Sequence, residues 1–478
     1  MTKLSVSLFA ALAAGLLSSC ASAQISSGVA VQDSQSPVSQ SAISIAEAQQ
    51  IYDYAYPLVI MKISQDLMFT VPIRERSVPN HFIHFKRLAM PQNRAVVLGN
   101  RNTLYSVGWI DLSKGPVVFE IPDMGERYYV MPLLDAWTNT FESFGSRTTG
   151  QQAQKYFIVN GDWNGEVPAG YQKVVSPTNM VWITGRIQAD SPKDAVAAGK
   201  LQDAFKLMTY AQLQGAEDPF ADYAPEFIAM QVRKPVPYSL KMTAEQFYDS
   251  FLRMWAANGS PAADAPMIET LKKAGIVRAK TRKFGELSPA VQQALQSGLE
   301  AKQAQYLKDF YEGSAQSQPW IFNRERMGVW GRDFERRTYW AMWGLGANLV
   351  EDAVYGVSQL DETLTPLNGS NAYKIHFEPG DLPPTSAFWS VTNYDEEGYL
   401  EANAENRYSL GSNHELAFNP DGSLDFYLSN SRPDIAEVNW VPAPRGNFKT
   451  LLRIYWPKEQ VLRGEWDLPP IKKVSGTE

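Results

Sequence analysis

Polar and charged residues stand beside aromatic residues in two stretches of this sequence. The first reads Asp-Ala-Trp-Thr-Asn at 135–139, with Ser-Arg-Thr-Thr-Gly following at 146–150. The second reads Trp-Ser-Val-Thr-Asn-Tyr-Asp at 389–395, with Asn-Arg-Tyr following at 406–408. Arginine next to acidic and amide side chains can bind a carboxylate or a sugar, and aromatic rings supply apolar platforms. The candidate catalytic residues are Asp135, Arg147, Asp395 and Arg407, and the candidate ligand-binding residues are Trp137, Asn139, Arg186, Trp389, Tyr394 and Asn439.

The same residue types also have a structural interpretation, in which they hold a large β-sandwich together. Buried Arg–Asp pairs and hydrogen-bonded Tyr and Trp side chains stabilise such folds, and aromatic residues are common in strands. The catalytic signatures G-x-S-x-G, S-x-x-K and H-E-x-x-H are absent from the sequence, as are a phosphate-binding Gly-Lys loop and a dinucleotide fingerprint. These absences argue against an α/β-hydrolase, a β-lactamase-like enzyme, a zincin and a P-loop protein.

The histidines and acidic turns give little support for a metal site. His81 and His84 would lie on one face of a helix but on opposite sides of a strand. A zinc site would need a distant histidine to converge with them, so we expect ordinary hydrogen-bonded histidines. Residues 393–398 imitate the start of an EF-hand loop, but its position 12 is Ala404 and strands flank it, which favours a hairpin turn. We therefore predict neither a metal nor a cofactor.

The first 23 residues have the three parts of a secretory signal. Lys3 provides the positive charge, residues 4–17 are apolar, and small residues follow. Two cleavage sites compete: residues 17–20 fit a lipobox that ends at Cys20, and residues 21–23 fit an A-x-A site. We favour lipidation of Cys20, because it is the only cysteine in the chain and occupies the lipobox position. The expected location is the periplasm or, as a lipoprotein, the periplasmic face of the outer membrane.

The charge balance and the hydropathy limit the partners. The chain has 44 Lys and Arg against 51 Asp and Glu, a net charge of -7, and no basic block offsets it. A mildly acidic surface repels phosphate backbones, so nucleic acid is not an expected partner. The apolar run at 339–350 is too short to span a bilayer, which leaves membrane contact to the lipid anchor alone. The expected ligand is a small molecule or saccharide, and the oligomeric state stays open.

Hydrophobic periodicity divides the chain into β, α and β regions. Short aromatic and β-branched runs separated by turns occupy residues 71–186 and 367–474, which is typical of antiparallel sandwiches. Between them, apolar residues recur at helical spacing. Residues 44–47 form a capping box that opens an earlier helix, which Pro57 ends or kinks. The predicted organisation is a signal peptide 1–23, a flexible tether 24–43, an N-terminal β-module with a leading helix 44–190, a helical region 191–360 and a C-terminal β-module 361–478.

The two β regions resemble each other in sequence pattern. Tyr105 and the turn at 123–125 in the first region align with Tyr373 and the turn at 395–398 in the second. Either an old duplication or the shared pattern of β-hairpins would produce this likeness. The sequence leaves the two explanations open.

Several long motifs resemble the DUF1254/DUF1214 family. Asn-Arg-Asn-Thr-Leu-Tyr-Ser at 100–106 and Leu-Asp-Ala-Trp-Thr-Asn at 134–139 resemble its N-terminal module. Phe-Trp-Ser-Val-Thr-Asn-Tyr-Asp at 388–395 and Asn-Trp-Val-Pro-Ala-Pro at 439–444 resemble its C-terminal module. The resemblance implies an α+β multidomain fold with an immunoglobulin-like β-sandwich, a helical middle domain and a jelly-roll-like β-sandwich. It carries over no catalytic residue. The family usually has Asp where this chain has Asn102, so an acid, base or metal ligand at that position would be missing here.

Two functions follow from these observations. The first is a hydrolase or lyase that acts on a small molecule or saccharide in an inter-domain cleft, with an acid/base pair drawn from the candidate residues. The second is a non-catalytic periplasmic lipoprotein that binds a ligand or supports envelope assembly. An enzyme should show a carboxylate with a raised pKa inside a cleft, whereas a binder should show an aromatic-lined groove whose acids are paired or exposed.

Overall fold

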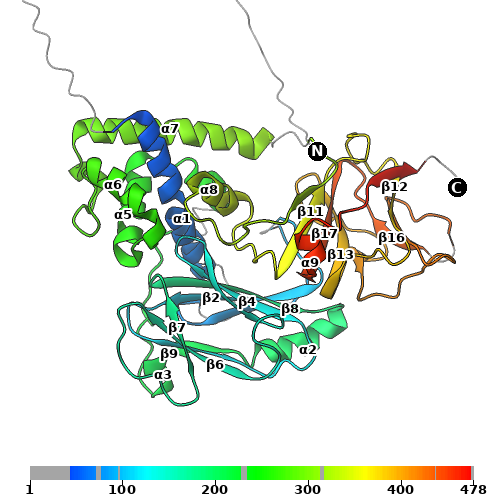
Figure 1. Cartoon of the computed structure of the whole chain (residues 1–478), viewed down its shortest axis with the longest axis horizontal. Coiled ribbons are helices and arrows are strands. Elements are labelled where there is room, and N and C mark those ends of the chain that lie inside the picture. Colours follow the sequence, from blue (N-terminus) through cyan, green and yellow to red (C-terminus); the bar gives the residue numbers. More distant parts are fainter. Residues whose placement is uncertain are drawn as a thin grey trace, which may run out of the picture. The chain divides into compact units, whose positions relative to one another are not determined.

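The computed structural model describes segments of the chain from residue 43 onward, and Cys20 and the rest of the expected signal lie outside them. Within these segments, no helix is long and apolar enough to cross a membrane. The expected α+β multidomain architecture is confirmed, with two β-sandwiches and a helical region (Figure 1). The described segments are residues 43–70, 77–94, 97–227, 234–312, 317–435 and 438–474.

The first sandwich has one sheet in the order β1-β2-β8-β4-β5 and a second in the order β7-β6-β3-β9. Its described strands are β1 (Phe82–Phe85), β2 (Thr103–Asp111), β3 (Val117–Ile121), β4 (Tyr129–Asp135), β5 (Thr140–Gly145), β6 (Gln154–Asn160), β7 (Gln172–Ser176), β8 (Met180–Gln188) and β9 (Lys206–Thr209). Successive side chains of a strand point to opposite faces of the sheet. Ile183 and Ile187 of β8 enter the core between the sheets, so Thr184 and Arg186 lie on the outer face.

The second sandwich has one sheet in the order β10-β11-β17-β13-β14 and a second in the order β16-β15-β12-β18. Its described strands are β10 (Ile321–Asn323), β11 (Ala353–Ser358), β12 (Ala372–Phe377), β13 (Thr385–Asp395), β14 (Ser409–Gly411), β15 (Leu424–Ser429), β16 (Asn439–Pro442), β17 (Phe448–Pro457) and β18 (Ile471–Val474). Leu452 and Ile454 of β17 enter its core, which places Arg453 and Tyr455 on the outer face.

The two sandwiches have the same topology, strand for strand. Adding nine to each strand number of the first gives the order of the second in both sheets. The pairing directions match as well, including the parallel pairs β6–β7 and β15–β16. A helix precedes the last strand in each case, α2 (Pro192–Gln202) and α9 (Glu459–Leu462). Because hairpin patterns alone do not reproduce crossovers and a parallel pair at the same place, we infer an internal duplication.

Local contacts repeat at the positions that this topology makes equivalent. Gly145 and Gly411 are each pressed against the backbone of the paired strand, β4 or β13, where a Cβ atom would clash. The next residues are Ser146 and Ser412. Each accepts a hydrogen bond at Oγ from a backbone N–H of that same strand, at 3.1 and 3.0 Å. The duplication therefore extends from strand order to individual side chains.

The strand correspondence changes the alignment expected from the sequence. β2 corresponds to β11, so Tyr105 is equivalent to Tyr355, whereas Tyr373 lies one strand later in β12. Short aromatic strands separated by Gly and Pro turns resemble their neighbours in sequence as much as their true counterparts. Only the pairing partners of each strand fix the correspondence.

The helical region is built around α1 (Ile45–Thr70), which begins at the expected capping box. Ser44 Oγ accepts from the Glu47 N–H at 3.2 Å, and Glu47 Oε2 accepts from the Ser44 N–H at 2.7 Å. Pro57 lies inside α1 and the helix continues past it to Thr70. The further helices are α3 (Tyr210–Leu213), α4 (Pro235–Ser239), α5 (Ala244–Asn258), α6 (Ala265–Lys273), α7 (Pro289–Glu312) and α8 (Phe334–Trp343), with 3₁₀ turns at Ala262–Asp264 and Phe284–Glu286.

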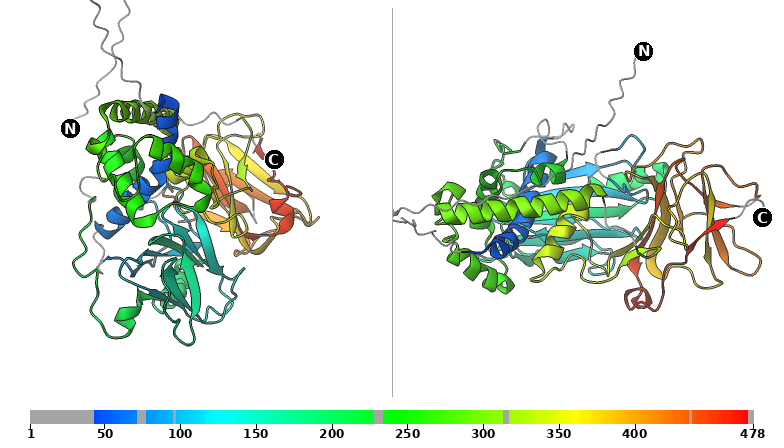
Figure 2. Two further views of the ribbon diagram at one scale, coloured as in Figure 1. Left: turned by 60° about the vertical axis from the view of Figure 1, so that its left-hand side comes forward. Right: turned by 90° about the horizontal axis from the view of Figure 1, so that it is seen from above.

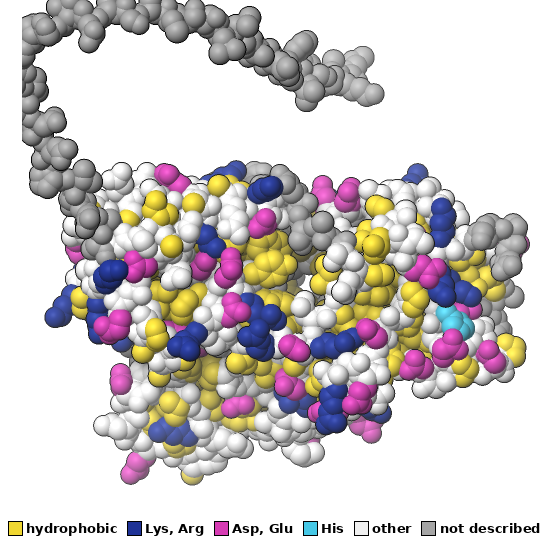
Figure 3. Space-filling view, turned by 45° about the horizontal axis from the view of Figure 1, so that its top comes forward, with side chains coloured by type: hydrophobic (Ala, Val, Ile, Leu, Met, Phe, Trp, Pro, Cys, Tyr) yellow, Lys and Arg dark blue, Asp and Glu magenta, His cyan; other side chains and the backbone are white. Residues whose placement is uncertain are grey.

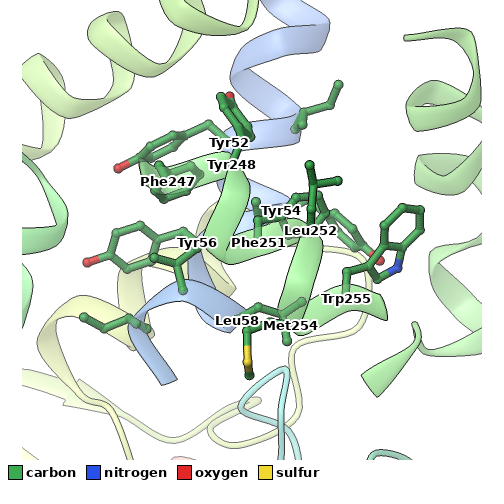
Figure 4. Packing of buried hydrophobic residues seen from close by; sticks show 14 of the residues in the cluster. Tyr52, Tyr54, Tyr56, Leu58, Phe247, Tyr248, Phe251, Leu252, Met254 and Trp255 are labelled. Carbon is green, nitrogen blue, oxygen red and sulfur yellow. The ribbon is translucent and has the colours of Figure 1, made fainter. Parts of the chain in front are cut away.

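Helix α1 is buried over most of its length because α5, α7 and α8 pack against it. In the right-hand view of Figure 2, the long α7 lies across α1. Figure 4 shows Tyr52, Tyr54 and Tyr56 of α1 among the aromatic residues of α5. Tyr52 stacks on Phe247 with the ring centroids 4.6 Å apart. This aromatic core is separate from the cores of the two sandwiches.

The module boundaries in the structure differ from those expected at residues 190 and 361. Helix α2 and strand β9 complete the first sandwich, which therefore ends at Thr209. β10 and β11 belong to the second sandwich, so that module begins at Ile321. The sequence pattern assigned these segments to the helical region because a helix inside a β-module carries the same periodicity as one outside it.

The surface mixes charges of both signs. Figure 3 shows a face on which Lys and Arg side chains are interspersed with Asp and Glu, with hydrophobic patches between them.

Candidate functional site

The outer faces of the sheets that contain β2 and β11 contact each other, and we refer to this contact as the inter-sandwich interface. Asn100 Nδ2 donates to the Tyr455 hydroxyl at 2.6 Å, and the Tyr394 hydroxyl donates to the Gly99 carbonyl at 2.7 Å. An apolar cluster that includes Phe388 and Tyr455 joins the two faces. Any ligand bound at this interface would contact both copies of the duplicated sandwich.

Each of the two sheets carries a tyrosine directly opposite an arginine on its outer face. Tyr105 of β2 pairs with Arg186 of β8, and Tyr355 of β11 pairs with Arg453 of β17. Across the first sheet, Arg186 pairs with Val130 of β4, which pairs with Gly145 of β5. Across the second sheet, Arg453 pairs in the same way with Ser390 of β13, which pairs with Gly411 of β14. The two Tyr–Arg pairs are therefore equivalent under the duplication. Together with two neighbouring tyrosines they form the tyrosine–arginine centre, which consists of Tyr105, Arg186, Tyr355, Tyr394, Arg453 and Tyr455.

Both guanidiniums of this centre are buried. Arg186 is 8% exposed and Arg453 is 3% exposed. Arg186 donates to two backbone carbonyl oxygens at 2.5 and 2.8 Å. Arg453 donates to a backbone carbonyl oxygen at 2.6 Å and to the Tyr394 hydroxyl at 2.8 Å. Within the described part of the chain, no carboxylate forms an ion pair with either arginine.

The tyrosines do not neutralise the two arginines. Burial raises the pKa of Tyr355 and of Tyr394 above the ordinary tyrosine value, and it raises the pKa of Tyr455 well above it. The phenols therefore stay protonated and uncharged at neutral pH. Each guanidinium also lies over a tyrosine ring, at 5.4 and 5.6 Å from the ring centroid. The surroundings of both cations consist of neutral oxygens and ring faces.

A surface pocket of about 620 Å³ lies at the same interface, and we refer to it as the interface pocket. The first sandwich lines it with residues 101–102 and with the start of α2, and the second lines it with residues from the segments 405–417 and 432–439. Its charged lining residues are Arg101, Arg407, Arg432, Asp190, Glu405 and Glu415. Cations, acids and amides of both sandwiches thus surround one space large enough for a small molecule.

The arginines of the interface pocket differ in their partners. The Arg101 guanidinium lies 5.1 Å from the centroid of the Tyr408 ring and donates to the Ala89 carbonyl at 2.7 Å. Among the residues that the structure describes, no carboxylate pairs with it. Burial lowers the pKa of Arg101, but an arginine remains protonated at neutral pH. Arg407 lies 4.0 Å from Glu405, so it is weakly paired.

A chain of hydrogen bonds links the interface pocket to the tyrosine–arginine centre. Asn102 Oδ1 accepts from Ser409 Oγ at 3.1 Å, and Ser409 Oγ accepts from Thr392 Oγ1 at 3.0 Å. Thr392 Oγ1 in turn accepts from Arg453 at 3.5 Å. Asn102 is therefore a buried residue of the pocket wall.

Asp135 and Asp395 occupy equivalent turns at the ends of β4 and β13. In each turn the aspartate N–H donates to the carbonyl four residues later, at 2.8 and 2.7 Å, and Oδ1 accepts the N–H of that residue at 2.8 Å. The residue before it has a positive φ, 67° at Thr138 and 92° at Gly398. In the first turn the Asn139 side chain also donates to Asp135, and burial raises the pKa of Asp135 to about 6. Both aspartates thus close hairpins, which satisfies the turn backbone.

The other candidate catalytic residues lie in separate environments. Arg147 Nε donates to the buried Asp352 at 2.6 Å. Asp395 faces Arg94 at 3.5 Å. Arg407 lines the interface pocket. The structure therefore does not bring the four side chains into one cleft.

The candidate ligand-binding residues divide into two groups. Arg186 and Tyr394 belong to the tyrosine–arginine centre, and Asn439 lines the interface pocket. Trp389 lies in the core of the second sandwich. Trp137 is fully buried, and its indole N–H donates to a backbone carbonyl of the helical region at 3.0 Å. Trp137 and Trp389 therefore pack the interior.

Carboxylates with raised pKa values also lie in the helical region. Burial raises the pKa of Asp53, which pairs with Lys302 at 2.8 Å, and that of Asp264, which pairs with Arg337 at 3.2 Å. Neither these two acids nor Asp135 is among the residues that line the interface pocket.

The histidines are placed apart from one another. Among the described residues, no group of three or more His, Cys, Asp or Glu side chains could hold a metal ion. His84 Nδ1 contacts Ser106 Oγ at 2.9 Å, but Ser106 is fully buried and burial lowers the pKa of His84 to about 4. A substrate cannot reach this serine, so the contact does not make an activated nucleophile. His376 bonds to Asp425, and His414 lines the interface pocket.

Sequence reasoning did not single out Tyr105, Tyr355 or Arg101. The available signal was weak, because a tyrosine or arginine at an outward position of a strand normally faces solvent. β8 and β17 do carry one arginine each among otherwise apolar alternating residues. Arg186 and Arg453 are buried only because the outer faces of the two sheets contact each other.

Comparison with known families assigns the chain to a class. The model described as "Protein of unknown function (DUF1254)" matches residues 79–209, which end where β9 ends. The model described as "Protein of unknown function (DUF1214)" matches residues 352–459, which cover most of the second sandwich. The chain therefore belongs to a class of two-sandwich proteins with a helical region between the modules. It is a DUF1254/DUF1214 domain-containing protein, as the sequence motifs predicted.

A solved structure supports this fold. The crystal structure of the VPA0106 protein from Vibrio parahaemolyticus is 25% identical and superposes with a TM-score of 0.66, covering 90% of this chain and 100% of that chain. An uncharacterised protein from Burkholderia cenocepacia is 9% identical with a TM-score of 0.42, covering 90% of this chain and 94% of that chain. A comparison with curated proteins found no match.

Proposed function

We propose that this protein is a non-catalytic binding protein that holds an acidic small molecule or acidic saccharide in the interface pocket. The carrying observation is Arg101, which lies in a pocket of about 620 Å³ over the Tyr408 ring and has no carboxylate partner among the described residues. A guanidinium bound only by neutral groups is available to an anionic ligand. The Tyr408 ring beneath it limits the positions that the guanidinium can take, which favours binding.

The polar groups around Arg101 fit an oxygen-rich ligand. Arg407 and Arg432 add donors, and Asn439 and His414 add groups that bind hydroxyls. Glu405 lies between two arginines of this set, 4.0 Å from Arg407 and 3.5 Å from Arg432. Acidic sugars, which combine hydroxyls with one carboxylate, match this mixture of groups.

The hydrolase or lyase considered from the sequence has less support. Asn102 stands on the pocket wall where the family usually has Asp, so the wall lacks a carboxylate at that point. An amide can neither donate nor accept a proton as a general acid or base at neutral pH. Asn102 can therefore form hydrogen bonds with a ligand, but it cannot transfer a proton as an Asp at this position could.

The test is calorimetric titration with galacturonate and galactose, a pair that differs in the carboxylate. Galacturonate should bind, and galactose should bind at least about tenfold more weakly, since a charge-assisted hydrogen bond contributes about 1.5–3 kcal/mol. Arg407→Met should weaken galacturonate binding, whereas Arg463→Met, a change at an exposed residue outside the pocket lining, should not. Equal affinity for both sugars, or turnover of galacturonate, would contradict the proposal.

We also propose that the protein acts outside the cytoplasm as a lipoprotein anchored through Cys20. The support is the sequence alone, namely Lys3, the apolar residues 4–17 and the lipobox at 17–20. Labelling with a palmitate analogue should mark the wild-type chain and leave Cys20→Ala unlabelled. Cleavage after residue 23 instead, detected by mass spectrometry of the N-terminal peptide, would contradict the anchor.

A further inference from the structure

We infer that the tyrosine–arginine centre is a second binding site, which takes a small organic acid with two carboxylates. The inference does not depend on the interface pocket, because it rests on different residues. Its basis is a centre built from two equivalent Tyr–Arg pairs, in which Arg186 and Arg453 are buried without a carboxylate partner in the described part of the chain.

The two positive charges of the tyrosine–arginine centre favour the binding of an anion. Removing a guanidinium from water is unfavourable unless an opposite charge compensates it. The bonds that Arg186 and Arg453 form end on neutral oxygens, and the pKa of the nearby Tyr455 is raised, so no phenolate supplies the missing charge. Two buried cations therefore act on the same small region. A dianion would compensate both at once.

The two arginines have tyrosine neighbours in common. Tyr355 and Tyr455 each interact electrostatically with both Arg186 and Arg453. Tyr105 acts on both arginines as well. A molecule lying among these three rings would therefore present carboxylates to both guanidiniums, each of which matches a carboxylate in its planar shape.

Further polar atoms of the same face lack partners. Ser390 lies beside Arg453 in the ladder between β13 and β17, and its Oγ is buried without a hydrogen-bond partner in the described structure. Asn348 donates to the Tyr355 hydroxyl at 2.9 Å, but its Oδ1 is likewise buried and unpartnered. Buried polar atoms are normally satisfied, so such atoms beside unpaired cations indicate a place for ligand oxygens and hydroxyls.

The walls of the centre favour a hydrocarbon backbone between the carboxylates. The rings of Tyr355 and Tyr455 and the apolar Val130, Ala353 and Phe388 border the inter-sandwich interface. Tyr355 remains partly accessible, so the centre is not fully closed. Apolar walls suit a short dicarboxylate better than inorganic phosphate, which has no apolar part.

The experiment is thermal unfolding of the full chain with increasing succinate, at constant ionic strength. Succinamide, which has the same length without charge, and inorganic phosphate are the parallel arms. Succinate should raise Tm in a saturable way, because a ligand that binds the native state stabilises it. Succinamide should leave Tm unchanged, and phosphate should act only at concentrations at least about tenfold higher.

Matched variants separate this centre from the interface pocket. Arg186→Met and Arg453→Met should abolish the succinate shift, whereas Arg407→Met, in the interface pocket, should keep it. Arg453→Lys keeps the charge but loses the planar fork, so its half-saturating succinate concentration should rise at least about tenfold even where Arg453→Met folds poorly. A galacturonate affinity that persists in Arg453→Lys would show that the two sites are independent.

Three results would overturn the inference. They are the absence of any succinate effect on the wild-type chain, a half-saturating succinate concentration that is unchanged in Arg186→Met and Arg453→Lys, and stabilisation by phosphate at the same concentration as succinate. Either of the first two results would show that the tyrosine–arginine centre does not bind succinate. The third would show that its ligand need not be a dicarboxylate. A failed galacturonate titration alongside an intact succinate shift would reject the interface pocket and leave the centre standing.

Discussion

Two regions of this molecule bury cationic side chains, and the two regions differ in the partners that these side chains have. In the helical region, Arg337 and Lys302 are buried beside Asp264 and Asp53, at 3.2 and 2.8 Å. In the inter-sandwich interface, Arg186 and Arg453 are buried without such partners among the described residues. A cation paired with a carboxylate belongs to the folded structure itself, whereas a cation held by neutral groups is open to a charged ligand. Partner choice therefore distinguishes structural from ligand-binding arginines better than burial does.

The position of each region explains the difference. Arg337 lies on α8 and Asp264 precedes α6, and their pairing helps to hold these helices beside α1. The interface, in contrast, joins two copies of one sandwich, and the duplication supplied each copy with the same Tyr–Arg pair. Because both equivalent positions carry an arginine, neither Arg186 nor Arg453 can serve as the counter-ion of the other.

The largest expected effect is the loss of the paired cation Arg337. Arg337→Met leaves Asp264 buried and unpaired, so we expect a loss of about 3–5 kcal/mol in the free energy of unfolding. Urea unfolding monitored by tryptophan fluorescence measures it. Asp264→Asn combined with Arg337→Met should recover part of the loss, and a loss below about 1 kcal/mol in the single variant would contradict a structural role.

The next effect concerns the pH dependence that Asp135 imposes. Its pKa is about 6 in the folded protein, above the value of about 3.9 in an unfolded chain, so the folded state binds more protons between these pH values. The contribution of the Asp135 carboxyl to the free energy of unfolding is fully present below pH ~4 and is lost as the pH rises through ~6. The total change is about 3 kcal/mol.

Asp135→Asn should therefore reduce the fall in unfolding free energy between pH 4.5 and pH 7.5. Asp395→Asn, at the equivalent turn of the second sandwich, is the matched control, because its side chain lies beside Arg94 near the surface. Identical slopes in all three proteins would show that Asp135 titrates normally.

A smaller effect is expected at Asn102. Asn102→Asp restores the residue usual in the family and adds a negative charge to the wall of the interface pocket. We expect galacturonate binding to weaken about tenfold, which is about 1.4 kcal/mol. Calorimetry measures the affinity, with Asn164→Asp, at an exposed residue outside the pocket lining, as the control. Unchanged affinity would place the ligand away from this wall.

The smallest expected effect is the change in unfolding free energy when Arg186 or Arg453 is replaced in the absence of ligand. Arg186→Met and Arg453→Met remove a buried charge without leaving an unpaired acid, so the free energy of unfolding should change by less than about 1 kcal/mol or should increase. This contrasts with Arg337→Met in the same assay. Losses as large as that of Arg337→Met would show that neutral oxygens and ring faces compensate the two cations fully.

The sequence by itself determined much of the architecture. The capping box at Ser44 and Glu47 fixed the start of α1, because its hydrogen bonds are local. Alternation along the strands identified two β-modules around helices, since a strand buried on one face must repeat every second residue. Long family motifs identified the two modules.

The tertiary structure alone decided the rest. Asp135 and Asp395 attract attention as acids in sequence, yet they close equivalent turns, because a turn aspartate and a catalytic one share the same neighbours in the chain. The equivalence of Tyr105 and Tyr355 required the strand pairing, since a shift by one strand preserves the sequence pattern. Above all, whether Arg186 faces solvent or Tyr355 depends on which sheet lies opposite, and that contact is made between residues far apart in the chain.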